Sequence, residues 1–150
     1  MRAVIQRVRE ADVKVDGRTI GKIGKGYMIL VGFSNNDNEE IISRMIKKIL
    51  DLRIFEDEAG KMNLNIRDAG GEILSISQFT LYADCRKGNR PGFSDAAKAE
   101  DASRMYDRFN ELLKEQIHTE TGQFQADMKV SLVNDGPVTI ILDSKEIIRN

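Results

Sequence analysis

Helical spacing of apolar residues is confined to two segments of this chain, and that limits the fold more than any other feature. Apolar residues recur every three or four positions over residues 37–50, and again over about residues 95–117. Elsewhere they alternate with polar residues or form short runs, as in β-strands. A chain with two amphipathic helices and more strand than helix is expected to pack its helices on a sheet.

The strand-like segments are separated by turn signals. Residues 11–16 alternate between apolar and polar, and Asp16-Gly17 predicts a hairpin turn directly after them. Residues 26–33 form a short branched apolar run bounded by glycine, which indicates a buried strand. Further strands are predicted at residues 52–55, 72–82 and 127–133, and in the VTIIL segment that follows a turn at NDGP.

The two helices have recognisable ends and faces. Asp37 or Asn36 can cap the first helix, and Glu39 and Glu40 suit the positive end of its dipole. The second helix presents one apolar face to the sheet. That face comprises Ala102, Met105, Tyr106, Phe109, Leu112, Leu113 and Ile117.

Length and composition are those of one soluble globular domain. The chain has 150 residues, of which 41% are hydrophobic and 31% charged, and its formal net charge is −1. We therefore predict a single compact layered α/β domain over residues 1–150, with mixed, largely antiparallel sheets and two main helices. The longest apolar run, Tyr27 to Phe33, is far shorter than the roughly 20 residues of a membrane-spanning helix. The N-terminus lacks the apolar core of a secretory signal, so we expect a cytoplasmic protein without membrane insertion.

The balance of charges and the lone cysteine narrow the range of partners. A single cysteine, Cys85, excludes an internal disulfide framework and a cysteine-rich zinc site. A chain with an isoelectric point near 5.9 has no overall positive field to attract nucleic acid. Any RNA binding must therefore use a local basic patch.

The usual side-chain nucleophiles and bases are poorly represented. The only histidine, His118, follows the second predicted helix, where it could serve a catalytic triad or simply stabilise the helix end. The cations Arg86 and Lys87 could lower the pKa of Cys85, but His118 is its only possible imidazole partner. Neither the triad with His118 nor the Cys85–His118 pair is favoured.

Metal and phosphate sites are not supported either. The chain has no histidine pair and no EF-hand spacing, and Glu56, Asp57 and Glu58 are typical of a solvated turn. The glycines of GKIGKG, residues 21–26, precede an apolar strand rather than a helix, which indicates a turn rather than a phosphate loop. We expect no metal and no cofactor.

Three segments are unusual, although each also has an ordinary interpretation. SQFTLYAD, residues 77–84, could be an edge strand whose hydroxyls bond the backbone. CRKGNRPG, residues 85–92, places three cations in a loop suited to phosphate contacts, or to solvent alone. NDGPVT, residues 134–139, contains a Gly-Pro step that is either an ordinary trans hairpin turn or a site for a cis peptide bond.

Together these segments resemble the D-aminoacyl-tRNA deacylase family. SQFTLY at residues 77–82 and NDGPVT at residues 134–139 are similar to the two signature motifs of that family. The resemblance extends, in order and at similar spacing, to MRAVIQRV, VDG, IGKG, KGNRP and FQADM. Gln125, where glycine is expected, and Gly92, where serine is expected, depart from the pattern but lie outside both signatures.

The resemblance implies a function and an assembly. The family hydrolyses the ester that joins a D-amino acid to the terminal ribose of tRNA, and it also acts on glycyl-tRNA. Its members are homodimers with an active site at each side of the subunit interface. By this resemblance, Gly136-Pro137 is cis and reaches into the pocket of the partner subunit. The implied fold is a compact α/β layered domain with mixed sheets.

The resemblance also suggests how the chemistry is divided. In the family, the backbone N–H at the position of Phe79 stabilises the oxyanion, and an adjacent ribose hydroxyl of the substrate can activate water. Thr80 is the competing candidate, as a side-chain nucleophile, although the sequence supplies no obvious base for it. Since D- and L-forms carry the same groups, selection must work by exclusion. A rigid backbone wall at Gly136-Pro137 suits that task.

Further residues match pocket positions of the family. Ser77 and Gln78 are expected to line the pocket and bond the terminal nucleotide. Phe124 and Met128 are expected to pack against adenine, while Met128 fits a core position equally well. The candidates for contact with the tRNA backbone are Arg86, Lys87 and Arg90.

Two rival hypotheses remain beside the cofactor-free deacylase. One is a noncatalytic RNA- or nucleotide-binding module with the same fold, which the intact signatures disfavour. The other is a different hydrolase that uses His118 or Cys85.

Overall fold

The order of elements alternates strands with two long helices. The computed structural model describes residues 1–148. Its elements are β1 (Arg2–Val15), β2 (Arg18–Ile23), β3 (Gly26–Gly32), α1 (Glu39–Asp51), β4 (Phe55–Glu56), β5 (Met62–Leu64), β6 (Glu72–Ser77), the 3-10 helix η1 (Phe79–Tyr82), α2 (Ala99–Lys114), β7 (Thr119–Thr121), β8 (Lys129–Asp143) and α3 (Ser144–Ile147). No helix among these residues is both long and apolar enough to cross a membrane.

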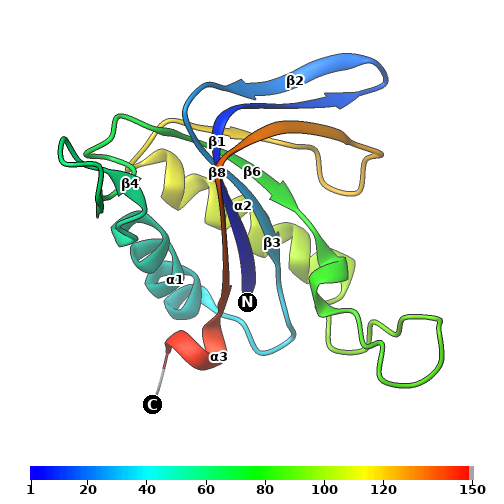
Figure 1. Ribbon diagram of the computed structural model, residues 1–150. Coiled ribbons are helices and arrows are strands. Elements are labelled where there is room, and N and C mark those ends of the chain that lie inside the picture. The colour runs from blue at the N-terminus through cyan, green and yellow to red at the C-terminus, as the bar shows by residue number, and fades with distance from the viewer. Residues whose placement is uncertain (149–150) are drawn as a thin grey trace.

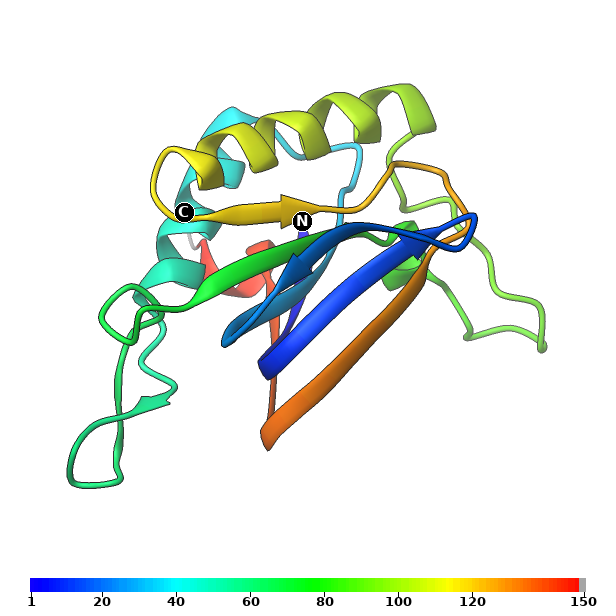
Figure 2. The same ribbon diagram turned by 90° about the horizontal axis from the view of Figure 1, so that it is seen from above.

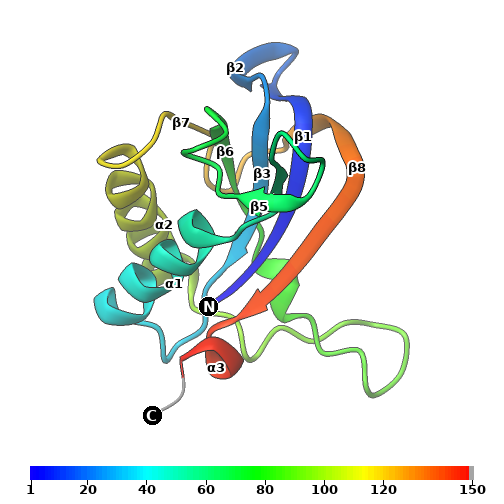
Figure 3. The same ribbon diagram turned by 60° about the vertical axis from the view of Figure 1, so that its left-hand side comes forward.

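Strand β1 is the centre of a six-stranded sheet (Figures 1 and 3). One of its edges pairs with β8, and the other pairs first with β3 and then with β2, all antiparallel. The pairs β3–β6 and β6–β7 are parallel. The predicted α/β fold, with a mixed, largely antiparallel sheet and two main helices, is therefore confirmed.

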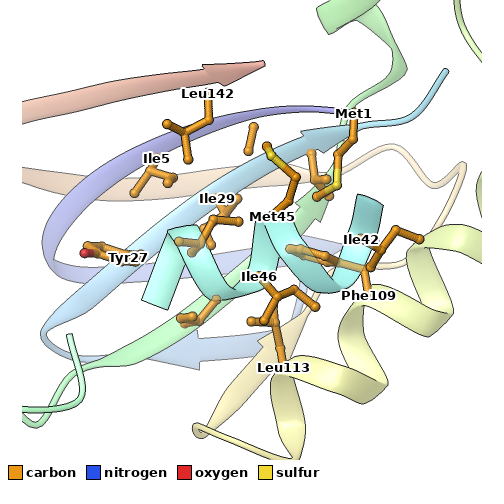
Figure 4. Close-up of a cluster of buried hydrophobic side chains, with 14 of the residues drawn as sticks. Met1, Ile5, Tyr27, Ile29, Ile42, Met45, Ile46, Phe109, Leu113 and Leu142 are labelled. Atoms are coloured by element: carbon orange, nitrogen blue, oxygen red, sulfur yellow. The ribbon is translucent and has the colours of Figure 1, made fainter. Parts of the chain in front are cut away.

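The two long helices lie on the same side of the sheet (Figure 2). They enclose the main core, where Ile42 and Met45 of α1 and Phe109 of α2 meet Ile5 and Ile29 of the sheet (Figure 4). Side chains of alternate strand residues point to opposite faces, so the same strands also bury a second set. This second cluster comprises Val8, Ala11, Val13, Ile23, Met28, Leu74 and Ile76.

The helices follow the predicted periodicity, but their ends differ. Asn38, rather than Asp37 or Asn36, caps α1, since its side chain accepts the N–H of Ile41 at 3.0 Å. The Asp37 carboxylate accepts instead from the ammonium group of Met1 and the N–H of Ser34, both at 2.6 Å. Helix α2 is shorter than predicted, so Ile117 packs on the core from beyond its end.

Three strand predictions need correction. The strand predicted at residues 72–82 ends at Ser77, where η1 begins, and the one at residues 52–55 is the short β4. The predicted turn at NDGP is absent, because β8 runs through it and pairs with β1 on both sides. The Asp16-Gly17 hairpin is confirmed, with φ of 51° and 76° at its two residues.

Candidate active site

A cavity of about 960 Å³ lies beside the second cluster, near the N-terminal end of α2. Its floor is apolar and includes Met28, Leu30 and Ile76 from β3 and β6. The structure brings five of the predicted site residues together around it. These are Ser77, Gln78, Phe79, Phe124 and Met128.

The SQFTLY segment changes from strand to 3-10 helix at the cavity rim. The N–H of Gln78 makes the last bond to β3, donating to the carbonyl of Val31 at 2.8 Å. The first N–H groups of a helix have no partner within it. Within residues 1–148, the N–H groups of Phe79 and Thr80 donate to no acceptor. The abrupt end of β6 thus leaves the N–H of Phe79 without an acceptor at the cavity rim.

The hydroxyl of Thr80 is tied to its neighbour rather than to a base. The side-chain amide of Gln78 donates to Thr80 Oγ1 at 2.5 Å. Among the described residues, no carboxylate or imidazole is hydrogen-bonded to Thr80, and Thr80 does not line the cavity. A serine or threonine nucleophile requires such an adjacent base. The arrangement therefore favours Thr80 as a polar contact over Thr80 as a nucleophile.

An exposed aromatic pair lies at this end of the molecule. The rings of Phe79 and Phe93 meet edge to face, with centroids 5.0 Å apart, although the two residues are 55% and 37% exposed. Large exposed aromatic side chains are typical of binding surfaces. Sequence analysis missed Phe93, because a single phenylalanine in a polar loop has no periodic signal.

The basic loop at residues 85–92 projects from the body (Figure 3). Asp84 and Gly92 close its base with two backbone hydrogen bonds of 2.7 and 2.9 Å. The guanidinium of Arg86 bonds both carboxylate oxygens of Asp84 and holds the pKa of that group at about 2. Within residues 1–148, Lys87 and Arg90 form no ion pair and are exposed. Of the three predicted phosphate contacts, Lys87 and Arg90 are thus accessible to a phosphate group, whereas Arg86 already binds a carboxylate.

Phe124 and Met128 line the cavity from the chain that leads to β8. The Phe124 ring packs on Tyr106, with centroids 6.2 Å apart. Burial raises the pKa of Tyr106, whose hydroxyl donates to the carbonyl of Ser75 at 2.7 Å. Met128 also packs against the second cluster. Met128 therefore lines the cavity and packs on the core at the same time, and its contact with adenine stays a prediction.

Gln125 lines the same cavity in a left-handed backbone conformation, with φ of 62°. That conformation costs a residue with a Cβ atom about 1 kcal/mol, and glycine avoids the cost. We expect Gln125→Gly to leave the melting temperature unchanged or to raise it by up to about 4 °C. The matched change Gln123→Gly, at an exposed neighbour, should lower it by a similar amount. Thermal unfolding of both variants checks this; equal losses would contradict it.

The structure does not bring Gly136 and Pro137 to the cavity of their own chain. They lie in residues 135–138 of β8, an excursion in which this strand is not paired with β1. Residue pairing continues on both sides of it, at Asn134 opposite Val8 and at Thr139 opposite Gln6. Between those pairs β1 has one residue and β8 has residues 135–138. The Gly136-Pro137 peptide bond is cis.

A buried arginine holds this excursion and was missed by sequence analysis. Arg7 is 7% exposed, and its Nε and Nη1 atoms donate to the carbonyls of Asp135 and Ile54 at 2.9 and 2.7 Å. Among the described residues it has no carboxylate partner. Alternate residues of β1, among them Ala3 and Ile5, are buried, and Arg7 occupies the next position of that series. This alternation is the sequence signal that could have revealed its burial.

The alternative catalytic residues lie apart from the cavity. His118 is half-exposed, with its Nε2 atom 3.5 Å from a carboxylate oxygen of Glu72 and 3.9 Å from one of Glu120. Cys85 is exposed in the basic loop. Within residues 1–148, no group of three or more His, Cys, Asp or Glu residues is placed to hold a metal ion.

Related sequences cover nearly the whole chain. Residues 4–143 match the family described as D-Tyr-tRNA(Tyr) deacylase. The chain is 56% identical over 146 residues to the D-aminoacyl-tRNA deacylase of Kosmotoga olearia, a match that covers 97% of this chain and 99% of that protein. It is 54% identical over 147 residues to the D-aminoacyl-tRNA deacylase of Clostridium novyi, with coverage of 97% and 99%.

Two solved structures share the fold. One, described as the c-Myc DNA unwinding element binding protein, superposes with a TM-score of 0.91 at 44% sequence identity and covers 95% of this chain and 98% of that one. The other is titled a structural analysis of a probable eukaryotic D-amino acid tRNA deacylase. It has a TM-score of 0.81 at 16% identity, with coverage of 94% and 97%.

Proposed function

The chain belongs to the D-aminoacyl-tRNA deacylase family, and we propose that it hydrolyses the ester between a D-amino acid and the terminal ribose of tRNA. The same reaction would remove glycine from mischarged tRNA, because glycine has no side chain for a chiral site to reject. The observation that best supports this proposal is the N–H of Phe79, which donates to no acceptor within residues 1–148 and lies at the rim of the cavity. With this substrate, the reaction would take place in the cytoplasm.

The N–H of Phe79 would stabilise the oxyanion that develops when water attacks the ester carbonyl. A fixed backbone donor performs this role without a charged side chain, and it needs no reorganisation during the reaction. The start of η1 supplies such a donor, held in place by the preceding bond from Gln78 to β3.

Activation of water would come from the substrate itself. Among the described residues, the only ionisable side chain that lines the cavity is Asp127, which is exposed and paired with Lys129 at 2.8 Å. The Thr80 hydroxyl already accepts a hydrogen bond from Gln78. A ribose hydroxyl beside the scissile ester is therefore the best-placed group to orient the water.

The cavity would hold the terminal adenosine, and the basic loop would hold the acceptor stem. Phe124 and Met128 offer apolar surface for the base, while Ser77 and Gln78 offer hydrogen bonds. Lys87 and Arg90, with Arg86 beside them, would contact phosphates.

Exclusion of L-amino acids would require a second copy of the chain. The exposed Gly136 and Pro137 lie outside the cavity of their own chain, so we propose that they enter the cavity of a partner in a homodimer. Exposed apolar residues on the same strand, Val133 at 47% and Ile141 at 73%, support a contact between copies there. Backbone carbonyls of the pair would then bind the amino group and block the L-form.

Hydrolysis of paired D- and L-tyrosyl-tRNA tests the proposal. We expect wild type and Thr80→Ala to hydrolyse the D-ester at rates within about tenfold of each other, because Thr80 only accepts a hydrogen bond. Neither protein should hydrolyse the L-ester above the uncatalysed rate. Loss of D-hydrolysis in a folded Thr80→Ala would transfer catalysis to that hydroxyl. Absence of D-hydrolysis in wild type would remove the deacylase proposal.

A noncatalytic nucleic-acid-binding module is the second candidate. The solved structure at 44% identity is described as a DNA unwinding element binding protein, and this chain has an exposed basic loop beside an aromatic pair. Titration with single-stranded DNA and with uncharged tRNA separates the two functions. Tight binding of either nucleic acid, together with no hydrolysis of the D-ester, would favour the binding module.

A further inference from the structure

The excursion of β8 leaves backbone groups that the sheet cannot satisfy. Strand pairing stops at Thr139 and resumes at Asn134, so residues 135–138 contribute nothing to the ladder with β1. Buried N–H and carbonyl groups almost always find another partner. Here side chains supply it. The Nε atom of Arg7 donates a hydrogen bond to the carbonyl of Asp135 at the start of the excursion.

The side chain of Asn134 accepts a hydrogen bond from the backbone at the other end of the excursion. Its Oδ1 atom accepts the N–H of Val138 at 2.8 Å, in a partly buried position. Its Nδ2 atom donates to Oγ1 of Thr139 at 3.0 Å. One side-chain amide thus joins the residue before the excursion to its last residue and to the residue after it.

The same network reaches the cavity. Oγ1 of Thr139 also accepts a longer hydrogen bond from Nε2 of Gln6, at 3.4 Å. Gln6 lines the cavity. The hydrogen bonds therefore run from the cavity wall through Thr139 and Asn134 to the backbone of Val138.

Gly136 and Pro137 lie between the two held points. Arg7 fixes the backbone before them, and Asn134 fixes the backbone after them. The guanidinium of Arg7 also packs closely on Gly136, since Nη2 lies 3.0 Å from the position that a Cβ atom would occupy. The segment is exposed, yet each of its ends is held by a hydrogen bond to a side chain.

We propose that Asn134 is a positioning residue for chiral selection. Its amide closes the excursion, and so it fixes the backbone wall of Gly136 and Pro137 at the distance that excludes an L-amino acid. This inference rests on the proposed function, in which that wall acts in the partner's cavity. Asparagine suits the place because it offers an acceptor and a donor at the end of a short side chain.

A pair of substitutions tests the role. Asn134→Leu has a similar size but can accept no hydrogen bond, whereas Asn134→Asp keeps the acceptor for Val138. We measure hydrolysis of D- and L-tyrosyl-tRNA and compare the ratio of the two rates. Asn134→Leu should raise the L-rate relative to the D-rate by on the order of tenfold, as expected for one lost hydrogen bond to a partly buried N–H. Asn134→Asp should keep the ratio within about threefold of wild type.

The ratio separates positioning from stability. A residue needed only for folding lowers both rates together and leaves their ratio unchanged. Asn36→Leu, at an exposed loop position, controls for adding an apolar side chain. A folded Asn134→Leu with the wild-type ratio would overturn the proposal. If that variant does not fold, the smaller Asn134→Ala decides: it also removes the acceptor for the N–H of Val138, and an unchanged ratio overturns the proposal as well. A wild type inert toward the D-ester would instead remove the deacylase function itself.

Discussion

Replacing Phe79 with proline should slow hydrolysis of D-aminoacyl-tRNA by roughly 10²–10³-fold, the usual cost of one lost oxyanion donor. Proline has no N–H, so the substitution deletes the proposed donor and leaves the side-chain positions around it in place. Phe79 is the first residue of η1, a position that proline favours, and within residues 1–148 its N–H has no acceptor to lose. Single-turnover rates with excess enzyme measure the effect on chemistry.

The matched control for this experiment is Phe79→Ala. It keeps the N–H but removes the ring that packs on Phe93, so it should weaken binding of the substrate more than it slows the chemical step. Circular dichroism and thermal unfolding establish that both variants fold. A folded Phe79→Pro with the wild-type rate would exclude the oxyanion role.

Replacing Gly136 with alanine is expected to reduce the D-rate by on the order of a hundredfold, the effect that a small displacement can have on a positioned site. A Cβ atom there would lie 2.8 Å from Cγ2 of Val138 and 3.0 Å from Nη2 of Arg7. The φ of Gly136, 135°, is also unfavourable for alanine. Either Arg7 or the backbone must move, and we expect unfolding to become easier by about 1–3 kcal/mol.

Gly70→Ala is a control that separates the effect of the steric clash at Gly136 from the effect of a positive φ. Gly70 has a φ of 70°, and a Cβ atom there would meet nothing within 4 Å. This variant should lose about 1 kcal/mol of stability and keep the wild-type rate. Chemical denaturation and the D-tyrosyl-tRNA assay measure both quantities. An equal loss of rate in the two variants would show that Gly136 has no special part in the reaction.

Long periodic segments were predictable from the sequence because they form by local rules. Both helices follow from the spacing of apolar residues, and the first hairpin follows from Asp16-Gly17. The strand predicted to extend to residue 82 was wrong because its apolar FTLY segment resembles a strand. A 3-10 helix this short has no periodicity of its own.

The NDGP segment shows where local rules fail. Gly-Pro between two apolar stretches predicts a turn, yet here it lies inside one strand. The strand continues because β1, more than a hundred residues earlier in the chain, pairs on both sides of the excursion. Only the assembled sheet contains that information. The same is true of Arg7, whose two carbonyl partners come from segments distant in sequence.

The candidate site was predictable in part. The family signatures located Ser77, Gln78 and Phe79, which the structure places on the cavity together with Phe124 and Met128. The same resemblance assigned Gly136 and Pro137 to the pocket of a partner subunit, and both residues lie outside the cavity of their own chain. The roles assigned to all these residues stay predictions until they are tested.

The excursion of β8 also bears on the tendency of this chain to aggregate. Within residues 1–148, β8 pairs only with β1, which leaves its outer edge open along Lys129–Asp143. A long regular edge of that kind is a template on which strands of other molecules can add, and it leads to aggregation. Residues 135–138 break this edge into two shorter lengths, as β-bulges do in many natural sheets. A variant that straightened β8 would therefore risk insolubility as well as lost selectivity.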